Sequence, residues 1–271
     1  MKSLQLKVLS VVASALAVVG VAVAPQATAA ERNLVAFGDS VLADPDAGSY
    51  LAHRYDPSKG VGVDCPTSNN YAKRAGAKLR LPVRDFSCSG AVSMSRGPQI
   101  FQQVDAAIRT GALSPATNRV VITTGFNDTY NHRDMSLPQI RKEFADRTAP
   151  QIERIKRAAP NARVQIVGYP TIGSGPYYCL LHFGPRPADS TFLPGIQDFE
   201  NKAQWMQVDL AARTGVQFLD MKPSTRNNGM CADANQRMWA GLVDFTGGDG
   251  NLPIHMNQRG HEHAANVIAR S

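Results

Sequence analysis

The stretch "VAFGDSV", Val35–Val41, decides how the rest of the chain is interpreted. Apolar residues run into Gly38 and then stop at Asp39 and Ser40. A short apolar run bounded by small polar residues is typical of a buried strand. Asp39 or Ser40 could cap a helix that follows the strand, or the serine could present its hydroxyl in a crevice. These seven residues leave both readings open.

Strand and helix patterns alternate along the chain outside this stretch. Alternation of this kind predicts crossover units and a parallel sheet covered on both faces. We therefore predict a three-layer α/β/α fold with a central, mostly parallel five-stranded sheet. The expected strands are 33–38, 83–88, 119–125, 163–169 and 216–220, and the expected helices are 69–80, 98–109, 137–159, 198–213 and 258–270.

Three long segments do not show the alternating strand and helix patterns. These segments are 41–68, 171–195 and 221–256. Each follows a predicted strand, so each leaves the carboxyl end of the sheet. Open α/β sheets bind their ligands at that end. We expect these segments to form the rim of a pocket and to carry its specificity.

The first 30 residues are typical of a secretory signal peptide. Lys2 and Lys7 precede a largely apolar run over 8–24, and small residues follow Pro25. We expect cleavage near Ala29 or Ala30, a secreted protein, and a single domain over 31–271. No later stretch approaches the roughly 18 apolar residues of a transmembrane helix.

The charge pattern argues against a nucleic-acid partner. The 29 basic and 22 acidic residues give +7, and removal of Lys2 and Lys7 leaves +5. The basic residues are scattered, with no arginine-rich arm or interleaved aromatic patch. We expect at most peripheral contact with a membrane or the cell envelope, and a monomer.

Four cysteines remain in the expected mature chain: Cys65, Cys88, Cys179 and Cys231. An even number in an exported protein indicates two disulfides, although free buried thiols are the alternative. We favour Cys65–Cys88 and Cys179–Cys231 because pairs that are nearest in sequence close the smaller loops. No C-x-x-C motif supports a zinc ribbon or a redox site.

Other strand ends carry residues that could meet Ser40. Gly90 in "CSGAVS" could offer an unobstructed backbone N–H, and Asn127 in "TTGFNDTY" could offer an amide donor to a developing oxyanion. His255 precedes the last predicted helix and could return to the same rim. Each residue alone is more often an ordinary turn or surface residue. We expect Asp128 to be a turn-stabilising acceptor rather than a catalytic acid.

Taken together, these segments resemble the SGNH hydrolases, also called the GDSL esterase/lipase family. "FGDSV", "SGA", "GFND" and "PIHMNQRG" match the four blocks of the family in order and span nearly the whole predicted mature chain. Cys88 lies two residues before Gly90, which resembles the secreted actinobacterial lipase and phospholipase branch. The resemblance implies the family fold with a flavodoxin-like strand order.

The resemblance also implies a role for each matched residue. Ser40 would be the nucleophile that forms an acyl-enzyme, and His255 would act as general base and acid. The backbone N–H groups of Ser40 and Gly90, with the Asn127 side chain, would form the oxyanion hole. No G-x-S-x-G surrounds Ser40, so the nucleophile elbow of α/β-hydrolases is not expected.

One position departs from the family pattern. The aspartate often found three residues before the histidine is replaced by Leu252. We expect the Leu252 carbonyl to orient the imidazole, with Asp249 as the alternative and Asp244 as a further one. A carbonyl fixes the tautomer but stabilises imidazolium less than a carboxylate does.

The expected activity is hydrolysis of carboxylic esters by a secreted serine hydrolase acting on a lipid or small-molecule ester. The stretch 169–185, "YPTIGSGPYYCLLHFGP", would suit an acyl-binding wall. A carbohydrate O-acetyl esterase is the alternative, and a non-catalytic binding protein on the same fold ranks lower. No cofactor or metal is expected, because His261 and His263 fall on different sides of a helix and are interpreted as surface residues.

Overall fold

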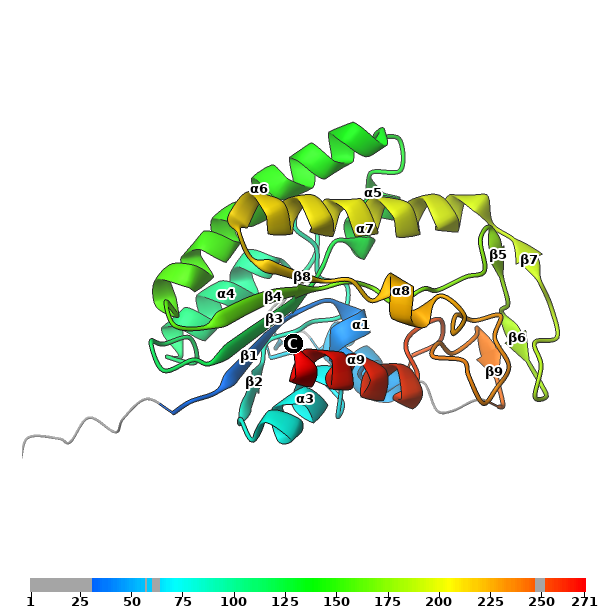
Figure 1. Ribbon diagram of the computed structural model, residues 1–271, viewed down its shortest axis with the longest axis horizontal. Coiled ribbons are helices and arrows are strands. Elements are labelled where there is room, and N and C mark those ends of the chain that lie inside the picture. Colours follow the sequence, from blue (N-terminus) through cyan, green and yellow to red (C-terminus); the bar gives the residue numbers. More distant parts are fainter. Residues whose placement is uncertain (1–30, 57, 60–63, 247–251) are drawn as a thin grey trace, which may run out of the picture.

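A computed structural model describes residues 31–56, 58–59, 64–246 and 252–271. Its centre is a sheet of five strands that pair in parallel throughout. The spatial order is β2-β1-β3-β4-β8, which is the predicted flavodoxin-like order 2-1-3-4-5. Figure 1 shows this sheet between layers of helices. The strands are β1 (Leu34–Gly38), β2 (Val83–Asp85), β3 (Arg119–Thr123), β4 (Arg163–Val167) and β8 (Gln217–Leu219).

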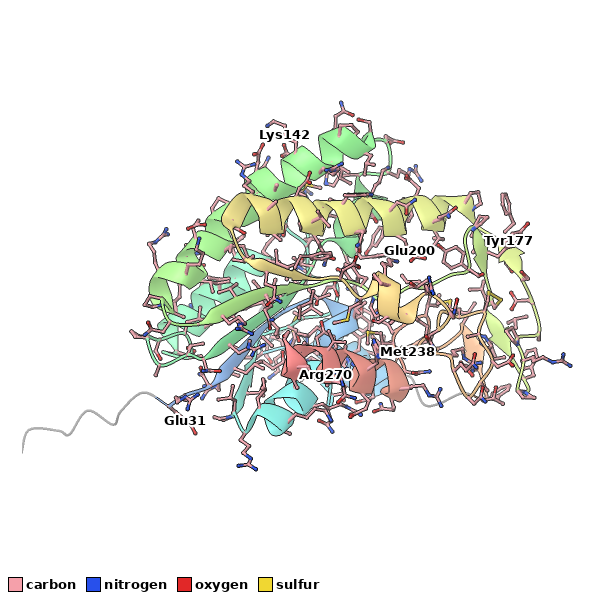
Figure 2. The ribbon with its side chains drawn as sticks, viewed as in Figure 1. Glu31, Lys142, Tyr177, Glu200, Met238 and Arg270 are labelled. Atoms are coloured by element: carbon pink, nitrogen blue, oxygen red, sulfur yellow. A yellow bond between two sulfur atoms is a disulfide. The ribbon has the colours of Figure 1, made fainter. Side chains whose placement is uncertain are left out.

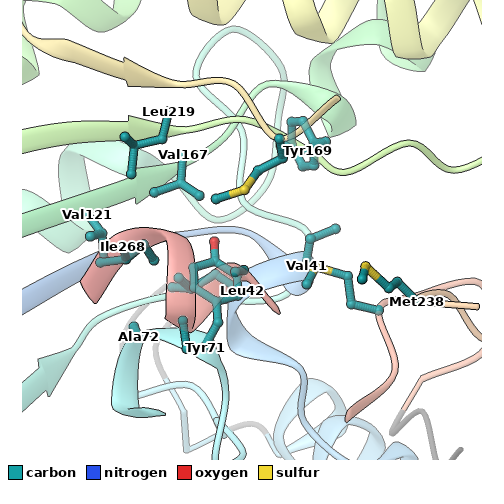
Figure 3. Packing of buried hydrophobic residues seen from close by; sticks show 14 of the residues in the cluster. Val41, Leu42, Tyr71, Ala72, Val121, Val167, Tyr169, Leu219, Met238 and Ile268 are labelled. Atoms are coloured by element: carbon teal, nitrogen blue, oxygen red, sulfur yellow. The ribbon is translucent and has the colours of Figure 1, made fainter. Parts of the chain in front are cut away.

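Helices cover both faces of the sheet, as the sequence predicts. Successive residues of β1 point to opposite faces, so Leu34 and Ala36 belong to one apolar cluster and Val35 and Phe37 to the other. The first cluster lies under α3 (Tyr71–Leu79) and α9 (Gln258–Arg270), and Figure 3 shows part of its packing. The second lies under α4 (Ile100–Arg109), α6 (Leu137–Ala158) and α7 (Pro194–Thr214).

One predicted helix begins earlier than expected. The sequence predicts a helix over 198–213, whose first residue, Asp198, would have suited an N-cap, but α7 begins at Pro194. Proline suits the first helical position because its fixed φ matches the helix and its missing N–H needs no partner there. Asp198 instead pairs with Lys202 one turn later.

The three long segments contain short elements that the sequence analysis did not resolve. They gather at the carboxyl end of the sheet, on the right of Figure 1. Most are two to four residues long, which is too short to show a helix or strand period in sequence. The nine-residue helix Ala47–Tyr55 buries no side chain and therefore shows no apolar stripe. The short elements are α1 (Ser40–Ala43), α2 (Ala47–Tyr55), α8 (Lys222–Thr225), the antiparallel pair β5 (Tyr177–Tyr178) with β7 (Thr191–Phe192), and the parallel pair β6 (Leu181–His182) with β9 (Val243–Asp244).

The structure joins Cys65 to Cys88 and Cys179 to Cys231, which are the pairs favoured from the sequence. The predicted signal peptide lies outside the described residues. Within the described part of the chain, every helix is too short or too polar to cross a bilayer.

Removal of the Cys179–Cys231 disulfide should lower stability substantially. The two cysteines are 52 residues apart, so the bond restricts a long loop in the unfolded chain. We expect Cys179→Ser/Cys231→Ser to lower the free energy of unfolding by about 2–4 kcal/mol, measured by urea denaturation. A double variant as stable as the parent chain would show that this bond contributes little to the fold.

Candidate active site

The end of β1 places Ser40 at the floor of the crevice. Asp39 is the N-cap of α1, and its side chain accepts a hydrogen bond from the Val41 N–H at 2.9 Å. Ser40 is therefore the first residue of a short helix, and Asp39 rather than Ser40 is the residue that caps it. Both alternatives considered for this stretch therefore hold. The carboxylate of Asp39 caps α1, and the hydroxyl of Ser40 is left for another partner.

That partner is His255. Its Nε2 lies 2.8 Å from Ser40 Oγ, although the two residues are 215 positions apart in sequence. Its Nδ1 lies 2.8 Å from the carbonyl oxygen of Pro253. A carbonyl only accepts, so the neutral ring carries its proton on Nδ1 and accepts the Ser40 hydroxyl proton at Nε2. The ring is thus oriented as a general base requires.

The prediction that the Leu252 carbonyl orients the ring is wrong by one residue. Ile254 has a left-handed φ of 61°, and its N–H donates to Gly241 O, which turns the chain back between Pro253 and His255. The carbonyl of Pro253, and not that of Leu252, therefore accepts the hydrogen bond from His255 Nδ1–H. An aspartate three positions away would reach the ring with its side chain, whereas a backbone carbonyl has no such reach. Leu252 instead lines the cavity described below.

The two acidic alternatives have different outcomes. Asp249 lies outside the described residues. Asp244 contacts Arg237 at 2.7 Å and accepts from the Gly241 N–H at 3.0 Å, so its carboxylate is engaged away from His255.

Gln103 of α4 clamps the last residue of β1, a contact that the sequence analysis missed. Its side chain donates to Gly38 O and accepts from Gly38 N–H, both at 2.9 Å. Gln103 is buried on the apolar face of α4. The sequence holds one sign of this contact, since Gln103 falls among the apolar positions of the helix. A buried amide is nearly always hydrogen-bonded, so its position predicts a polar partner inside the protein.

Gly90 and Asn127 line the same cavity as Ser40 and His255. Gly90 has φ +81°, a conformation that favours glycine, and no atom lies within 4 Å of where a Cβ would stand. Within the described residues, the backbone N–H groups of Ser40 and Gly90 have no hydrogen-bond partner. Both donors therefore remain available to a ligand.

The Asn127 amide is held on two sides. Its Nδ2 donates to Ala91 O at 2.9 Å, and its Oδ1 accepts from the Tyr130 hydroxyl at 3.1 Å. An amide nitrogen carries two hydrogens, so one N–H remains for the cavity. The sequence analysis identified Asn127 but not the tyrosine that fixes its orientation.

Asp128 holds the loop that follows Gly90. Its buried carboxylate accepts from the backbone N–H groups of Ser93, Met94 and Ser95 at 2.8–3.1 Å. Burial raises its pKa, and these hydrogen bonds oppose the rise. Asp128 is thus an acceptor that fixes a turn, as predicted.

A second buried carboxylate, that of Asp39, links the turn that carries Ser40 to α5 (Phe126–Asn131). Tyr169 donates its hydroxyl proton to Asp39 and accepts from the Phe126 N–H at 3.1 Å. Burial raises the pKa of Asp39 to about 7, against the opposing effect of the Tyr169 hydrogen bond. The segments that carry Ser40 and Asn127 are therefore connected through one phenol.

A third buried carboxylate, that of Asp44, contacts His261 of α9. Asp44 and His261 are both buried, and their side chains approach to 3.0 Å. The prediction that His261 is a surface residue is wrong. Its Nδ1 accepts from the Tyr71 N–H and its ring stacks on Tyr71, because this side of α9 packs against α3.

Burial lowers the pKa of the His255 imidazole below its ordinary value of 6.5. The Pro253 carbonyl and the negative charge of Asp44 oppose this effect, while His261 adds to it. The ring is consequently neutral, and competent as a base, at neutral pH.

The cavity has a volume of about 520 Å³ and joins a polar floor to an apolar wall. The floor holds the Ser40–His255 pair, and the wall comes largely from segments 171–195 and 221–256, as predicted. The Cys179–Cys231 disulfide crosses this wall between Tyr178, Leu180 and Met230. The apolar lining residues are Val41, Phe126, Ile172, Leu180, Leu193, Ile196, Met230, Trp239, Leu252, Pro253 and Ile254.

Glu200 joins this wall to helix α7. Its buried carboxylate accepts from the N–H groups of Ile172 and Gly173 at 3.1 Å and from the Tyr178 hydroxyl at 2.7 Å. Lys222 forms an ion pair with it. The wall is therefore fixed by charge-assisted hydrogen bonds beneath its apolar surface.

Metal ligands do not gather among the described residues in any group of three or more. His263 contacts the Ser224 hydroxyl at 2.8 Å, and His182 contacts Met230 O at 2.8 Å.

A family model described as the GDSL-like lipase/acylhydrolase family matches residues 36–263. The chain therefore belongs to this family, and the expected class of carboxylic ester hydrolase is confirmed at that level. No curated protein matches the chain significantly.

Solved structures show the same fold at low identity. A phospholipase A1 from Streptomyces albidoflavus NA297 is 20% identical, with a TM-score of 0.57 over 89% of this chain and 99% of that one. An extracellular lipase from Streptomyces rimosus is 20% identical, with a TM-score of 0.50 over 88% and 98%. Est24, a carbohydrate acetylesterase from Sinorhizobium meliloti, is 16% identical, with a TM-score of 0.51 over 89% and 97%.

The lowered pKa of His255 predicts the position of the acid limb of activity. Only the neutral ring can accept the Ser40 proton, so activity is lost as the pH falls through this pKa. We expect the midpoint of kcat/KM for a soluble nitrophenyl ester to lie below 6.5. Asp44→Asn should move it lower still, because Asp44 raises the pKa.

The exposed Asp134→Asn is the matched control and should leave the midpoint in place. Asparagine also tolerates the left-handed backbone at position 44, where φ is 46°. An upward shift in Asp44→Asn would contradict this electrostatic account.

Proposed function

We propose that the protein is a secreted serine esterase that cleaves carboxylic esters with an apolar acyl group. The observation that carries the proposal is the 2.8 Å contact between Ser40 Oγ and His255 Nε2 at the floor of an apolar cavity. Residues 31–271 form its single catalytic domain. The predicted signal peptide and the two disulfides support export.

The first half of the reaction is attack on the ester carbonyl. His255 Nε2 takes the proton from Ser40 Oγ as the oxygen bonds to the carbonyl carbon. The carbonyl oxygen becomes an oxyanion that accepts from the Ser40 and Gly90 N–H groups and from Asn127 Nδ2. The imidazolium then protonates the leaving alcohol, and the acyl group remains on Ser40.

The second half repeats these steps with water. His255 takes a proton from the water, the hydroxide attacks the acyl-enzyme, and the proton returns to Ser40 Oγ as the acid leaves. The Pro253 carbonyl accepts from Nδ1–H throughout and keeps Nε2 directed at the reacting oxygen. A carbonyl brings no negative charge to the ring, unlike the aspartate that the family often has before the histidine. The negative charge of Asp44 replaces part of that effect, because it raises the pKa of His255.

The apolar wall favours lipid or aliphatic esters over acetylated sugars. A hydrocarbon chain gains about 25 cal/mol for each Å² of apolar surface that it buries, whereas sugar hydroxyls need polar partners. The fold similarity to a carbohydrate acetylesterase keeps the O-acetyl esterase as the second candidate. The contacts of His255 argue against a non-catalytic binding protein. Such a protein would not need the Pro253 carbonyl to fix the tautomer of His255, or Nε2 to be aligned with Ser40 Oγ.

Hydrolysis of a small substrate panel tests the proposal. We expect the purified protein to hydrolyse nitrophenyl butyrate and longer acyl esters faster than it deacetylates acetylated xylan. Ser40→Ala should abolish both the hydrolysis and the labelling of the protein by a fluorophosphonate. A folded protein that resists the probe and leaves every ester intact would favour the binding-protein alternative.

The orienting carbonyl predicts that Asp249→Asn retains activity within a few-fold. The matched comparison is Asn127→Ala, which removes an oxyanion donor and should lower kcat by about 10²–10³-fold. Steady-state kinetics with nitrophenyl butyrate measures both. A loss of kcat by orders of magnitude in Asp249→Asn would assign the orienting role to that carboxylate instead.

A further inference from the structure

Large exposed apolar side chains are concentrated at one end of the molecule. Thirteen are exposed among the described residues, and ten of them belong to segments that follow the carboxyl ends of sheet strands. The other three are Phe101 and Ile108 on α4 and Trp205 on α7. Figure 2 shows Tyr177 at the edge of the molecule far from Glu31. A concentration of this kind marks an interaction surface rather than scattered exposure.

Two pairs of aromatic rings stand out in this set. Tyr177 and Phe192 face each other across the β5–β7 pair, with ring centroids 5.5 Å apart. Phe183 and Phe245 follow β6 and β9, with centroids 5.9 Å apart. The exposed fractions of Phe183 and Phe245 are 56% and 77%. We call these four side chains, together with Ile254, the apolar rim.

The apolar rim adjoins the cavity at Ile254. Tyr177 and Phe192 directly precede Tyr178 and Leu193, which line it. Ile254 lines the cavity and is also 42% exposed. Ile254 therefore belongs both to the apolar rim and to the lining of the cavity.

The charges of the two segments that carry most of the apolar rim nearly cancel. Segment 171–193 holds Arg186 and Asp189. Segment 221–246 holds three basic residues and two acidic ones, Asp233 and Asp244, so the sum over both segments is +1. These two segments, as far as the structure describes them, therefore hold no basic cluster of the kind that selects anionic lipid. A surface without net charge complements them.

We propose that the apolar rim docks on a zwitterionic lipid surface, so that an acyl ester passes from the lipid phase directly into the cavity. This inference rests on the proposed function and names aggregated lipid as the substrate class. Insertion of exposed aromatic side chains into the headgroup region supplies the attraction, and its strength follows the apolar area buried.

Binding to phosphatidylcholine vesicles tests the proposal without hydrolysis. The full chain with Ser40→Ala should co-sediment with the vesicles, and moderate changes in salt should alter the partition little. Adding Phe183→Ser and Phe245→Ser should weaken the partition at least tenfold. The matched control adds Phe101→Ser and Ile108→Ser, which remove exposed apolar side chains on α4, and should change it less than twofold.

Parallel assays separate the possible outcomes. With Ser40 intact, Phe183→Ser/Phe245→Ser should hydrolyse soluble nitrophenyl butyrate at the parent rate. Absent vesicle binding, or equal loss in the α4 control, overturns the proposal. A dimer seen by light scattering and dissolved by Phe183→Ser/Phe245→Ser also overturns it, in favour of self-association. Vesicle binding by a protein that cleaves no ester would instead refute the proposed function and leave the docking surface standing.

Discussion

The arrangement depends on one hydrogen bond between residues 215 positions apart, from the Ser40 hydroxyl to Nε2 of His255. It forms only when the imidazole is neutral and carries its proton on Nδ1, so that Nε2 can accept. Burial keeps the ring neutral, and the Pro253 carbonyl occupies Nδ1. A backbone acceptor fixes the tautomer without bringing a second charge into contact with the ring.

Buried carboxylates around the site hold backbone rather than substrate. Asp128 binds the loop after Gly90, and Asp39 links the nucleophile turn to Tyr169. Such groups cost free energy to desolvate, and hydrogen bonds to backbone N–H groups offset that cost. The result is a rigid floor, on which donors stay in place while the substrate changes shape. Asp44 differs, because its charge also acts on the pKa of His255.

Much of this could be predicted from the sequence. The alternation of strand and helix patterns predicted the parallel sheet. The resemblance to a known family predicted its strand order and the meeting of Ser40, Gly90, Asn127 and His255 in one cavity. Contacts that depend on tertiary packing could not be predicted in this way. The choice of Pro253 over Leu252 depends on one left-handed residue, Ile254. The burial of His261 depends on how α9 packs against α3, and no local pattern encodes that geometry.

A crystal structure of the protein phosphonylated at Ser40 would show whether the proposed donors meet at one oxygen atom. We expect the phosphonyl oxygen to accept hydrogen bonds from the N–H groups of Ser40 and Gly90 and from Asn127 Nδ2, each at about 2.7–3.1 Å. We also expect His255 Nδ1 still to donate to Pro253 O. A phosphonyl oxygen turned toward solvent, or an imidazole held by a carboxylate, would contradict these expectations.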